Sequence, residues 1–356
     1  IYCDYRRFPG ISYQIFYTQQ LKRRGWRKQF LCPRIFFRKG VCRLLEQVRI
    51  YSKRDGLKLD LLLGLPERKP LAMVQLLHGM CEHKERYLPF MEYLNRQGLI
   101  TVIHDHRGHG RSVKDRNDLG YMNGQGSGVL VEDARCVTGY MRNRFGGEMP
   151  LILFGHSMGS LTARVYARQY GADLNGLILC GVPSERPALS LGIGIAEILK
   201  RWKGDRFRSG LLEAVTFGPF AAAFRSERQK FAWICSNRQV AKEYEESPLC
   251  GFRFTVDGYL TLFGLMKEAY RKSRCQNPGL PVLLTGGSAD PCMGGRRKVS
   301  DTVQSLRAEG YGTVLCRRYG TMRHEILQEE EREQVFADLY HFMKKTLRED
   351  KKDHEM

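Results

Sequence analysis

Residues 151–167 read LILFGHSMGSLTARVYA, and this stretch decides the fold. Four apolar residues lead into Gly155-His156-Ser157-Met158-Gly159, and a segment with helical character follows at once. Where a strand turns sharply into a helix around a serine between two glycines, the hydroxyl is exposed above the sheet and the helix N-terminus stabilises negative charge nearby. The stretch therefore predicts a strand–turn–helix unit that presents Ser157 as a nucleophile.

The segments on either side alternate between strand and helix. Such alternation is typical of an α/β fold with a mostly parallel sheet covered by helices on both faces. Strands are expected in the hairpin 46–66, at 71–79 and 175–183, and at the starts of 99–112, 279–291 and 312–327. Helices are expected over 85–98, 129–147, 258–273 and 329–350.

Residues 184–255 break this alternation. They hold apolar helical patches such as LGIGIAEIL and FGPFAAAF without a clear strand. We therefore expect a helical insertion between two halves of the sheet. These patches either shelter an apolar ligand or simply pack the insertion against the core, and the sequence leaves both readings open.

Composition sets limits on the class of protein. The chain has 356 residues, of which 42% are hydrophobic, so it can bury a sizeable core. No apolar run reaches the roughly 18–20 residues that cross a bilayer, and the richest one, 188–199, contains Glu197. The eleven cysteines include no C-x-x-C pair, which argues against a zinc ribbon or a disulfide scaffold and fits a reducing, cytoplasmic setting.

The net charge of +20 is unevenly distributed. Residues 1–40 contain ten Lys or Arg against one acid, Asp4, together with several aromatic residues. A basic, aromatic segment of this kind binds anionic membrane surfaces or nucleic acid, or is an extension outside the working domain. We expect no nucleic-acid partner, and we keep a peripheral membrane contact through residues 1–40 as an option. Nucleic-acid binding would be sensitive to salt and would vanish when residues 1–40 are removed.

A serine nucleophile needs a base and a carboxylate that orients the base. In the chain order Ser…Asp…His, Asp290 follows the strand PVLLT in TGGSADP, and His324 follows the next strand in YGTMRHEIL. Both side chains are then expected at the carboxyl ends of their strands, beside Ser157. An Asp in a Gly/Pro turn and a solvated loop histidine are the plain alternatives, but His324 is the best placed of the nine histidines.

The run HDHRGHG at 104–110 invites a metal-binding interpretation because it holds three histidines. No helical H-E-x-x-H pattern supports that interpretation, and we expect no metal ion and no organic cofactor.

Two backbone N–H groups are needed to stabilise the oxyanion that forms during acyl transfer. One is expected from Met158, directly after the nucleophile, and the other from Met80, in the loop after the strand VQLLHG. The methionine side chains also suit an apolar pocket for an acyl chain.

Five motifs now occur in order: HGMCEHKERY (78–87), HDHRGHGRS (104–112), GHSMGS (155–160), GGSADP (286–291) and MRHEI (322–326). Together they resemble the monoacylglycerol lipase and lysophospholipase branch of the α/β-hydrolase superfamily, often described as serine-aminopeptidase-like hydrolases. The resemblance covers about residues 46–348. It implies Ser157 as nucleophile, Asp290 as acid and His324 as base, with Met80 and Met158 forming the oxyanion hole.

The resemblance also implies an organisation of the chain. It gives a basic extension at 1–40, a first half of the hydrolase core at 41–183, a helical cap at 184–255, a second half of the core at 256–348 and a charged tail at 349–356. The basic extension is not part of the family pattern.

The implied activity is hydrolysis of carboxylic esters of acyl lipids, a monoacylglycerol or a lysophospholipid, through an acyl-enzyme. Basic residues in the cap favour an anionic head group and hence a lysophospholipid, or they form a solvated surface. These residues are Arg201, Lys203, Arg206 and Arg208. A serine aminopeptidase on the same fold would need a cap carboxylate for a free amine, for which Glu243, Glu245 and Glu246 are available. A non-catalytic binding protein is a further alternative. Oligomeric state is not encoded in any of these patterns.

Overall fold

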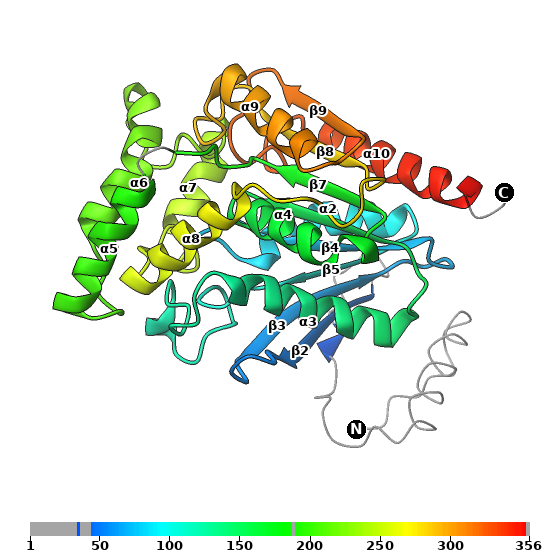
Figure 1. The fold of residues 1–356 in the computed structure, drawn as a ribbon, viewed down its shortest axis with the longest axis horizontal. Helices are drawn as coiled ribbons and strands as arrows, with labels where there is room; N and C mark the ends of the chain where they lie inside the picture. The colour runs from blue at the N-terminus through cyan, green and yellow to red at the C-terminus, as the bar shows by residue number, and fades with distance from the viewer. Residues whose placement is uncertain (1–33, 36–43, 187–188, 354–356) are drawn as a thin grey trace. The chain divides into compact units, whose positions relative to one another are not determined.

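A nine-stranded sheet forms the centre of the computed structural model, which describes residues 34–35, 44–186 and 189–353 (Figure 1). The strand order is β1-β2-β3-β5-β4-β6-β7-β8-β9. The strands are β1 (Arg34–Ile35), β2 (Leu44–Tyr51), β3 (Lys58–Leu65), β4 (Ala72–Leu77), β5 (Leu99–His104), β6 (Leu151–His156), β7 (Gly176–Cys180), β8 (Val282–Gly287) and β9 (Val314–Tyr319). The expected α/β architecture is confirmed.

The sheet changes character from one edge to the other. From β1 to β5 along the strand order, the neighbours β1–β2, β2–β3 and β3–β5 pair antiparallel, and β2 and β3 form a hairpin that turns at Asp55-Gly56. From β5 to β9 every pair is parallel. The inner strands are buried along their whole length, as a parallel sheet covered on both faces requires. The carboxyl ends of these strands meet at one edge of the sheet.

Helices cover both faces and enclose two apolar cores. One core packs α3 (Gly128–Phe145), α4 (Met158–Tyr170), α8 (Val256–Ala269) and α9 (Gly295–Ala308) on one face. The other packs α2 (Leu88–Arg96) and α10 (Arg332–Asp353) on the opposite face. Helix α9 was not among the helices expected from the sequence.

A group of helices is inserted between β7 and α8. It comprises α5 (Leu189–Lys203), α6 (Gly210–Ala223) and α7 (Arg238–Glu246), and we call it the cap. In Figure 1, α5 and α6 lie beyond one end of the sheet, with α8 next to α5. A small apolar cluster holds the cap together around Phe220, Trp233 and Tyr244.

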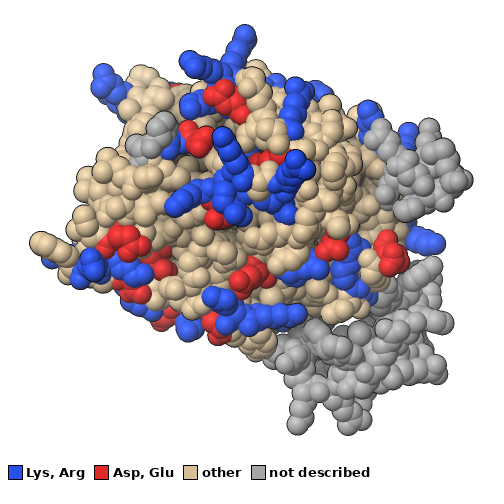
Figure 2. All heavy atoms as spheres, in the orientation of Figure 1, with Lys and Arg blue, Asp and Glu red and all other residues tan. Residues whose placement is uncertain are grey.

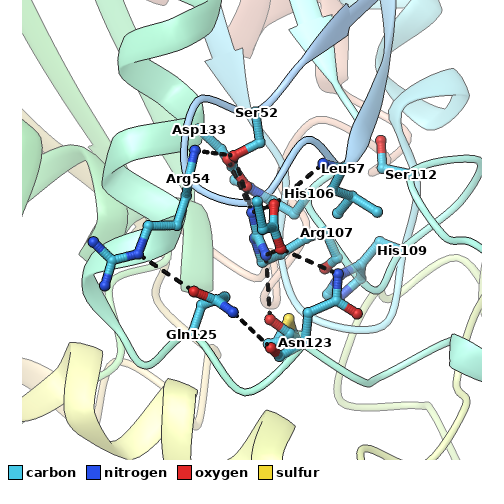
Figure 3. A network of polar contacts seen from close by, with 12 residues as sticks. Ser52, Arg54, Leu57, His106, Arg107, His109, Ser112, Asn123, Gln125 and Asp133 are labelled. Carbon is cyan, nitrogen blue, oxygen red and sulfur yellow. Dashed lines mark hydrogen bonds and ion pairs between the residues drawn. The ribbon is translucent and has the colours of Figure 1, made fainter.

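A buried arginine ties the antiparallel edge of the sheet to its helical layer (Figure 3). Arg107, in the loop after β5, binds Asp133 of α3 through Nε at 2.7 Å and Asp55 of the β2–β3 turn through a terminal nitrogen at 2.9 Å. Its guanidinium also donates to Ser52. Because Arg107 is fully buried, its charge needs these partners, and the sequence motif HDHRGHG is therefore in part a structural clamp.

The surface of the described residues carries scattered charge. Figure 2 shows Lys and Arg side chains spread over this face in larger number than Asp and Glu, in line with the net charge of +20. Among the described residues, none of the helices combines the length and the apolar character that spanning a bilayer requires.

Most of the segment 1–40 lies outside the described residues. Its described part, β1, pairs antiparallel with β2, with Arg34 opposite Gln47 and Ile35 opposite Glu46. The division of the chain at 40, 183, 255 and 348 stays a prediction.

Candidate active site

Ser157 lies at the turn between β6 and α4, where its backbone adopts φ +51°. A positive φ is strained for a residue with a side chain, and such strain is characteristic of functional sites. The flanking glycines are required by close approach. A Cβ at Gly155 would lie 2.2 Å from the carbonyl oxygen of Gly159, and one at Gly159 would lie 2.2 Å from that of Leu77. The turn thus packs α4 directly against β4 and β6.

His324 and Asp290 are joined by a hydrogen bond. His324 Nδ1 lies 2.9 Å from Asp290 Oδ2, and both residues are buried. The other oxygen of Asp290 accepts the backbone N–H of Cys292 at 2.8 Å, which fixes the carboxylate in the turn after β8. Since Nδ1 faces the carboxylate, Nε2 is the nitrogen left for a proton from a nucleophile.

Ser157 and His324 line one cavity of about 340 Å³. Met80 also lines it, whereas Asp290 lies behind His324. Much of the remaining wall is apolar and comes largely from the cap: Phe217, Ala221, Phe231, Trp233, Ile234 and Phe252. Of the five residues predicted for the site, Ser157, His324 and Met80 line the cavity and Asp290 binds His324. The fifth, Met158, directly follows Ser157 in the chain.

The two predicted oxyanion donors, Met80 and Met158, both lie next to Ser157 in the chain or in space. Met158 is the first residue of α4, so its N–H has no acceptor within the helix. Met80 follows Gly79 in the loop after β4, and a Cβ built at Gly79 would lie 3.2 Å from the Cβ of Ser157. The Gly79 N–H donates to Glu82 Oε1 at 2.5 Å, which holds this loop beside the serine.

The charges around His324 favour its protonated form. Burial by itself lowers the pKa of His324, but Asp290, followed by Glu325 and Glu82, raises it above the ordinary value of 6.5. The neighbouring His156 ring lies 4.7 Å from the His324 ring between centroids, and burial lowers the pKa of His156 well below 6.5. The two neighbouring histidines thus have pKa values shifted in opposite directions, upward for His324 and downward for His156.

An ion-paired group beside His324 was not predicted from the sequence. Arg86 binds Glu325 through both terminal nitrogens at 2.5 and 2.6 Å and Glu82 at 3.0 Å. It thereby joins the loop that carries Met80 to the loop that carries His324. The sequence did contain a pointer to this ion-paired group, because Glu82 and Arg86 belong to the motif HGMCEHKERY and Glu325 directly follows His324.

The histidine-rich motif forms a packed cluster of neutral rings. The rings of His78 and His106 lie 4.4 Å apart between centroids, and those of His104 and His106 lie 4.8 Å apart. Burial lowers the pKa of His104 to about 3 and that of His109 to about 4.

Among the described residues, two other groups of side chains bring together atoms of the kind that can bind a metal ion. These atoms come within 4.8 Å of one another in the group Asp290, Cys292 and His324 and in the group Glu82, His156 and Glu325. In both groups, hydrogen bonds within the group or to Arg86 already use the carboxylates. The residues therefore fit a hydrolytic site better than a metal centre.

The cap residues that the sequence offered for substrate binding lie elsewhere. Arg206 pairs with Asp118 and Arg208 donates to the carbonyls of Asn117 and Leu119, so both tie the cap to the core. The remaining five candidates are exposed and are not among the lining residues: Arg201, Lys203, Glu243, Glu245 and Glu246. The charged cap residues that line the cavity are Glu213, Lys230 and Arg253, and Arg253 is bound to Glu213.

Comparison with known proteins identifies the family. Residues 68–331 match the family model described as Serine aminopeptidase, S33. The chain belongs to this family. It is 26% identical to a monoacylglycerol lipase of Mycolicibacterium smegmatis over 277 residues, covering 77% of this chain and 88% of the relative. It is 30% identical to human monoglyceride lipase over 231 residues, covering 63% of this chain and 67% of the relative.

Solved structures show the same fold. A thermostable carboxyl esterase from Bacillus coagulans in complex with glycerol superposes with a TM-score of 0.77 at 23% identity, covering 85% of this chain and 99% of the esterase. A monoacylglycerol lipase from Paleococcus ferrophilus gives a TM-score of 0.62 at 21% identity, covering 81% and 99% of the two chains. The expected α/β-hydrolase fold, the expected family and the class of carboxylic ester hydrolase are confirmed.

Proposed function

We propose that this family member hydrolyses the ester bond of monoacylglycerols, with Ser157 as nucleophile, His324 as base and Asp290 as the carboxylate that orients His324. One observation carries the proposal: Ser157 and His324 line a single, largely apolar cavity, and His324 Nδ1 is held by Asp290 at 2.9 Å. The monoacylglycerol and monoglyceride lipases among the relatives support the choice of substrate.

The proposed mechanism is acyl transfer to water. His324 Nε2 takes the proton of the Ser157 hydroxyl as its oxygen attacks the ester carbonyl. The resulting oxyanion accepts hydrogen bonds from the backbone N–H groups of Met80 and Met158, each typically contributing ~2.7–4 kcal/mol to the stabilisation. The protonated His324 then donates to the leaving glycerol oxygen. Water attacks the acyl-enzyme with His324 again as base, which releases the fatty acid and frees Ser157.

The lining of the cavity favours an acyl chain with a neutral alcohol. Helix α6 contributes Phe217 and Ala221 to the wall, whereas none of the described residues of α5 is among the lining residues. Lys230 is the one lining lysine, and Arg253 is bound to Glu213. A phosphate head group would therefore find few unpaired cations, which argues for monoacylglycerol over lysophospholipid.

A substrate panel tests the proposal. We expect kcat/KM to be highest for monoacylglycerols, lower for lysophospholipids with the same acyl chain, and negligible for aminoacyl anilides. Ser157→Ala should abolish every activity, and it is the matched control for contaminating esterases. A panel in which lysophospholipid leads would contradict the head-group argument, and ester hydrolysis that survives Ser157→Ala would contradict the site.

A serine aminopeptidase is the second candidate, because the family description names that activity. A peptide's free amine would need a carboxylate in the cavity. Glu82 and Glu325 line the cavity but are bound to Arg86, which leaves Glu213 of the cap as the candidate. Its ion pair with Arg253 argues against that role. Glu213→Gln separates the two: an aminopeptidase would lose its anilide activity, whereas ester hydrolysis should remain.

We also propose that the protein works at an anionic membrane surface. Residues 1–40 carry ten Lys or Arg, although most of them lie outside the described residues. Among the described residues, large apolar side chains are exposed on the cap, with Trp202 82% and Leu191 67% exposed. Trp202 lies between Arg201 and Lys203, a combination that suits an anionic interface.

Flotation with vesicles tests this part. The chain lacking residues 1–33, which keeps β1 and its pairing, should bind phosphatidylserine vesicles more weakly than the full chain. Trp202→Glu should weaken binding further. Equal flotation of all three proteins, or equal binding to neutral vesicles, would contradict the membrane proposal.

A further inference from the structure

Arg323, the residue directly before His324, reaches out of the core into the cap. Its guanidinium binds the Glu227 carboxylate through both terminal nitrogens, one of them at 3.0 Å. It also donates to the carbonyl oxygen of Ala232 at 2.5 Å and lies 4.2 Å from the centre of the Phe224 ring. A planar guanidinium with several donors suits such a multiple contact. All of these partners lie in the cap segment 224–236.

The same cap segment contacts the loop on the other side of His324. Glu325 N–H donates to the carbonyl oxygen of Ile234 at 2.8 Å. Glu329 accepts the N–H and the hydroxyl of Ser236, and its other contact is the N–H of Arg323 at 2.8 Å. The loop that carries His324 is therefore bound to the cap both before and after the histidine.

Little water reaches this contact. The side chain of Arg323 is 12% exposed and that of Glu227 is 22% exposed. An ion pair at this depth is screened less than a surface pair, and removal of one partner leaves a poorly hydrated charge. The Arg323–Glu227 ion pair can therefore stabilise the position of the loop, whereas a solvated surface pair contributes little.

The cap segment also touches the space for the substrate. Trp233 and Ile234 line the cavity, and the Trp233 ring lies 5.2 Å from the His324 ring between centroids. These two residues lie between the carbonyls of Ala232 and Cys235, both of which accept from Arg323. A substrate that displaces Trp233 therefore acts on the segment that holds the histidine loop.

From this geometry we propose that Arg323 is a positioning residue that couples the cap to the base: the Arg323–Glu227 pair docks segment 224–236 on the loop 323–329 and so aligns His324 with Ser157. The inference rests on the proposed role of His324. It assigns a function to a cap residue, Glu227, that lines no part of the cavity among the described residues.

A double-mutant cycle tests the coupling. The variants are Arg323→Gln, Glu227→Gln and the double variant, with Arg323→Lys as the conservative change. Arg317→Gln is the control for loss of an arginine ion pair outside the cap, because Arg317 binds Asp338 and is more exposed than Arg323. For each protein, kcat and KM are measured on a monoacylglycerol, together with the thermal midpoint and the downfield proton resonance of the His324 Nδ1–H.

We expect both single variants to lower kcat, by roughly ten- to a hundredfold for Arg323→Gln, since a small misplacement of a reacting group has effects of that size. KM should change little, and the Nδ1–H resonance should broaden. Glu227→Gln should have no further effect in the Arg323→Gln background, because the two side chains act as one unit. Arg323→Lys should recover part of kcat, and Arg317→Gln should behave like the wild type.

Three results would overturn the coupling. The first is wild-type kcat in both single variants. The second is additive effects in the double variant. The third is a loss of kcat explained fully by a lower thermal midpoint, with the resonance unchanged. Each of these leaves the hydrolase proposal standing as long as Ser157→Ala is inactive, so the two failures are distinguishable.

Discussion

The turn at Ser157 gives a prediction whose size follows from the structure. Gly159→Ala adds a single methyl group in the first turn of α4, where alanine is normally the better helix former by up to about 1 kcal/mol. Here the new Cβ would lie 2.2 Å from the carbonyl oxygen of Leu77 and 2.6 Å from that of His78. Carbon and oxygen approach to roughly 3.3 Å at closest, so α4 or β4 must move by about 1 Å.

Neither element can move freely. Leu77 ends β4, which pairs with β5 on one side and β6 on the other. We therefore expect Gly159→Ala to lower the free energy of unfolding by ~1–3 kcal/mol, the range of overpacked cores. The displaced α4 also carries the Met158 N–H, so kcat/KM should fall by about a hundredfold.

Gly139→Ala is the matched control. Gly139 lies within α3, and a Cβ there meets no heavy atom within 4 Å, so this variant should be as stable as the wild type or more so, with full activity. Urea unfolding and kcat/KM on a monoacylglycerol are measured on all three proteins. Wild-type stability and activity of Gly159→Ala would refute the close packing of the turn against β4.

Three further variants and one control test charged groups in the site and in the core. Glu325→Gln removes a negative charge that raises the pKa of His324. The acid limb of the pH profile of kcat/KM should therefore lie above pH 6.5 in the wild type and move to lower pH in the variant. An acid limb that does not move would contradict the assignment of His324 as the base. Asp290→Asn should lower kcat by about 10⁴-fold with the fold intact, and a small effect would remove Asp290 from the mechanism. Arg107→Ala should lower the free energy of unfolding by roughly 3–5 kcal/mol because it leaves the buried Asp133 unpaired. Arg135 lies on the same helix as Asp133, and Arg135→Ala, which breaks a half-exposed ion pair, should lower the free energy of unfolding by less than about 1 kcal/mol. Similar losses in both variants would contradict the clamp.

The sequence predicted the elements that bury a continuous apolar face. Strands β4 to β8 each contain a short apolar run, and tertiary contacts only reinforce that pattern. Ser157 and Asp290 were predicted for the site because each follows such a strand. His324 was predicted because it follows the next parallel strand, β9, although that strand is largely exposed, and the carboxyl ends of parallel strands meet at one edge. The order of three motifs along the chain therefore carried information about their proximity.

Helix α9 was missed because its pattern is weak. Its first turn is Gly295-Arg296-Arg297-Lys298. With Gly294 before it, this stretch of two glycines and three basic residues resembles a solvated loop. The helical signal is confined to Val299, Val303 and Leu306, spaced four and three residues apart. Three apolar positions on an otherwise polar segment bury one narrow face, which only the neighbouring sheet makes evident.

The cap could not be derived from the sequence in the same way. The patches LGIGIAEIL and FGPFAAAF look alike, yet α6 lines the cavity while α5 packs on α8. Likewise, Arg206 and Arg208 look like free cations but bind Asp118 and backbone carbonyls of the core. Which apolar face meets the cavity and which cation is paired depend on long-range contacts that no local pattern encodes.

The acyl-enzyme account is tested most directly by mass spectrometry of the protein after treatment with a fluorophosphonate, an irreversible serine reagent. The account predicts a single adduct on the peptide that contains Ser157, loss of ester hydrolysis in proportion to labelling, and no adduct in a folded Ser157→Ala variant. An adduct on another residue, or an unlabelled wild-type protein that still hydrolyses esters, would contradict it.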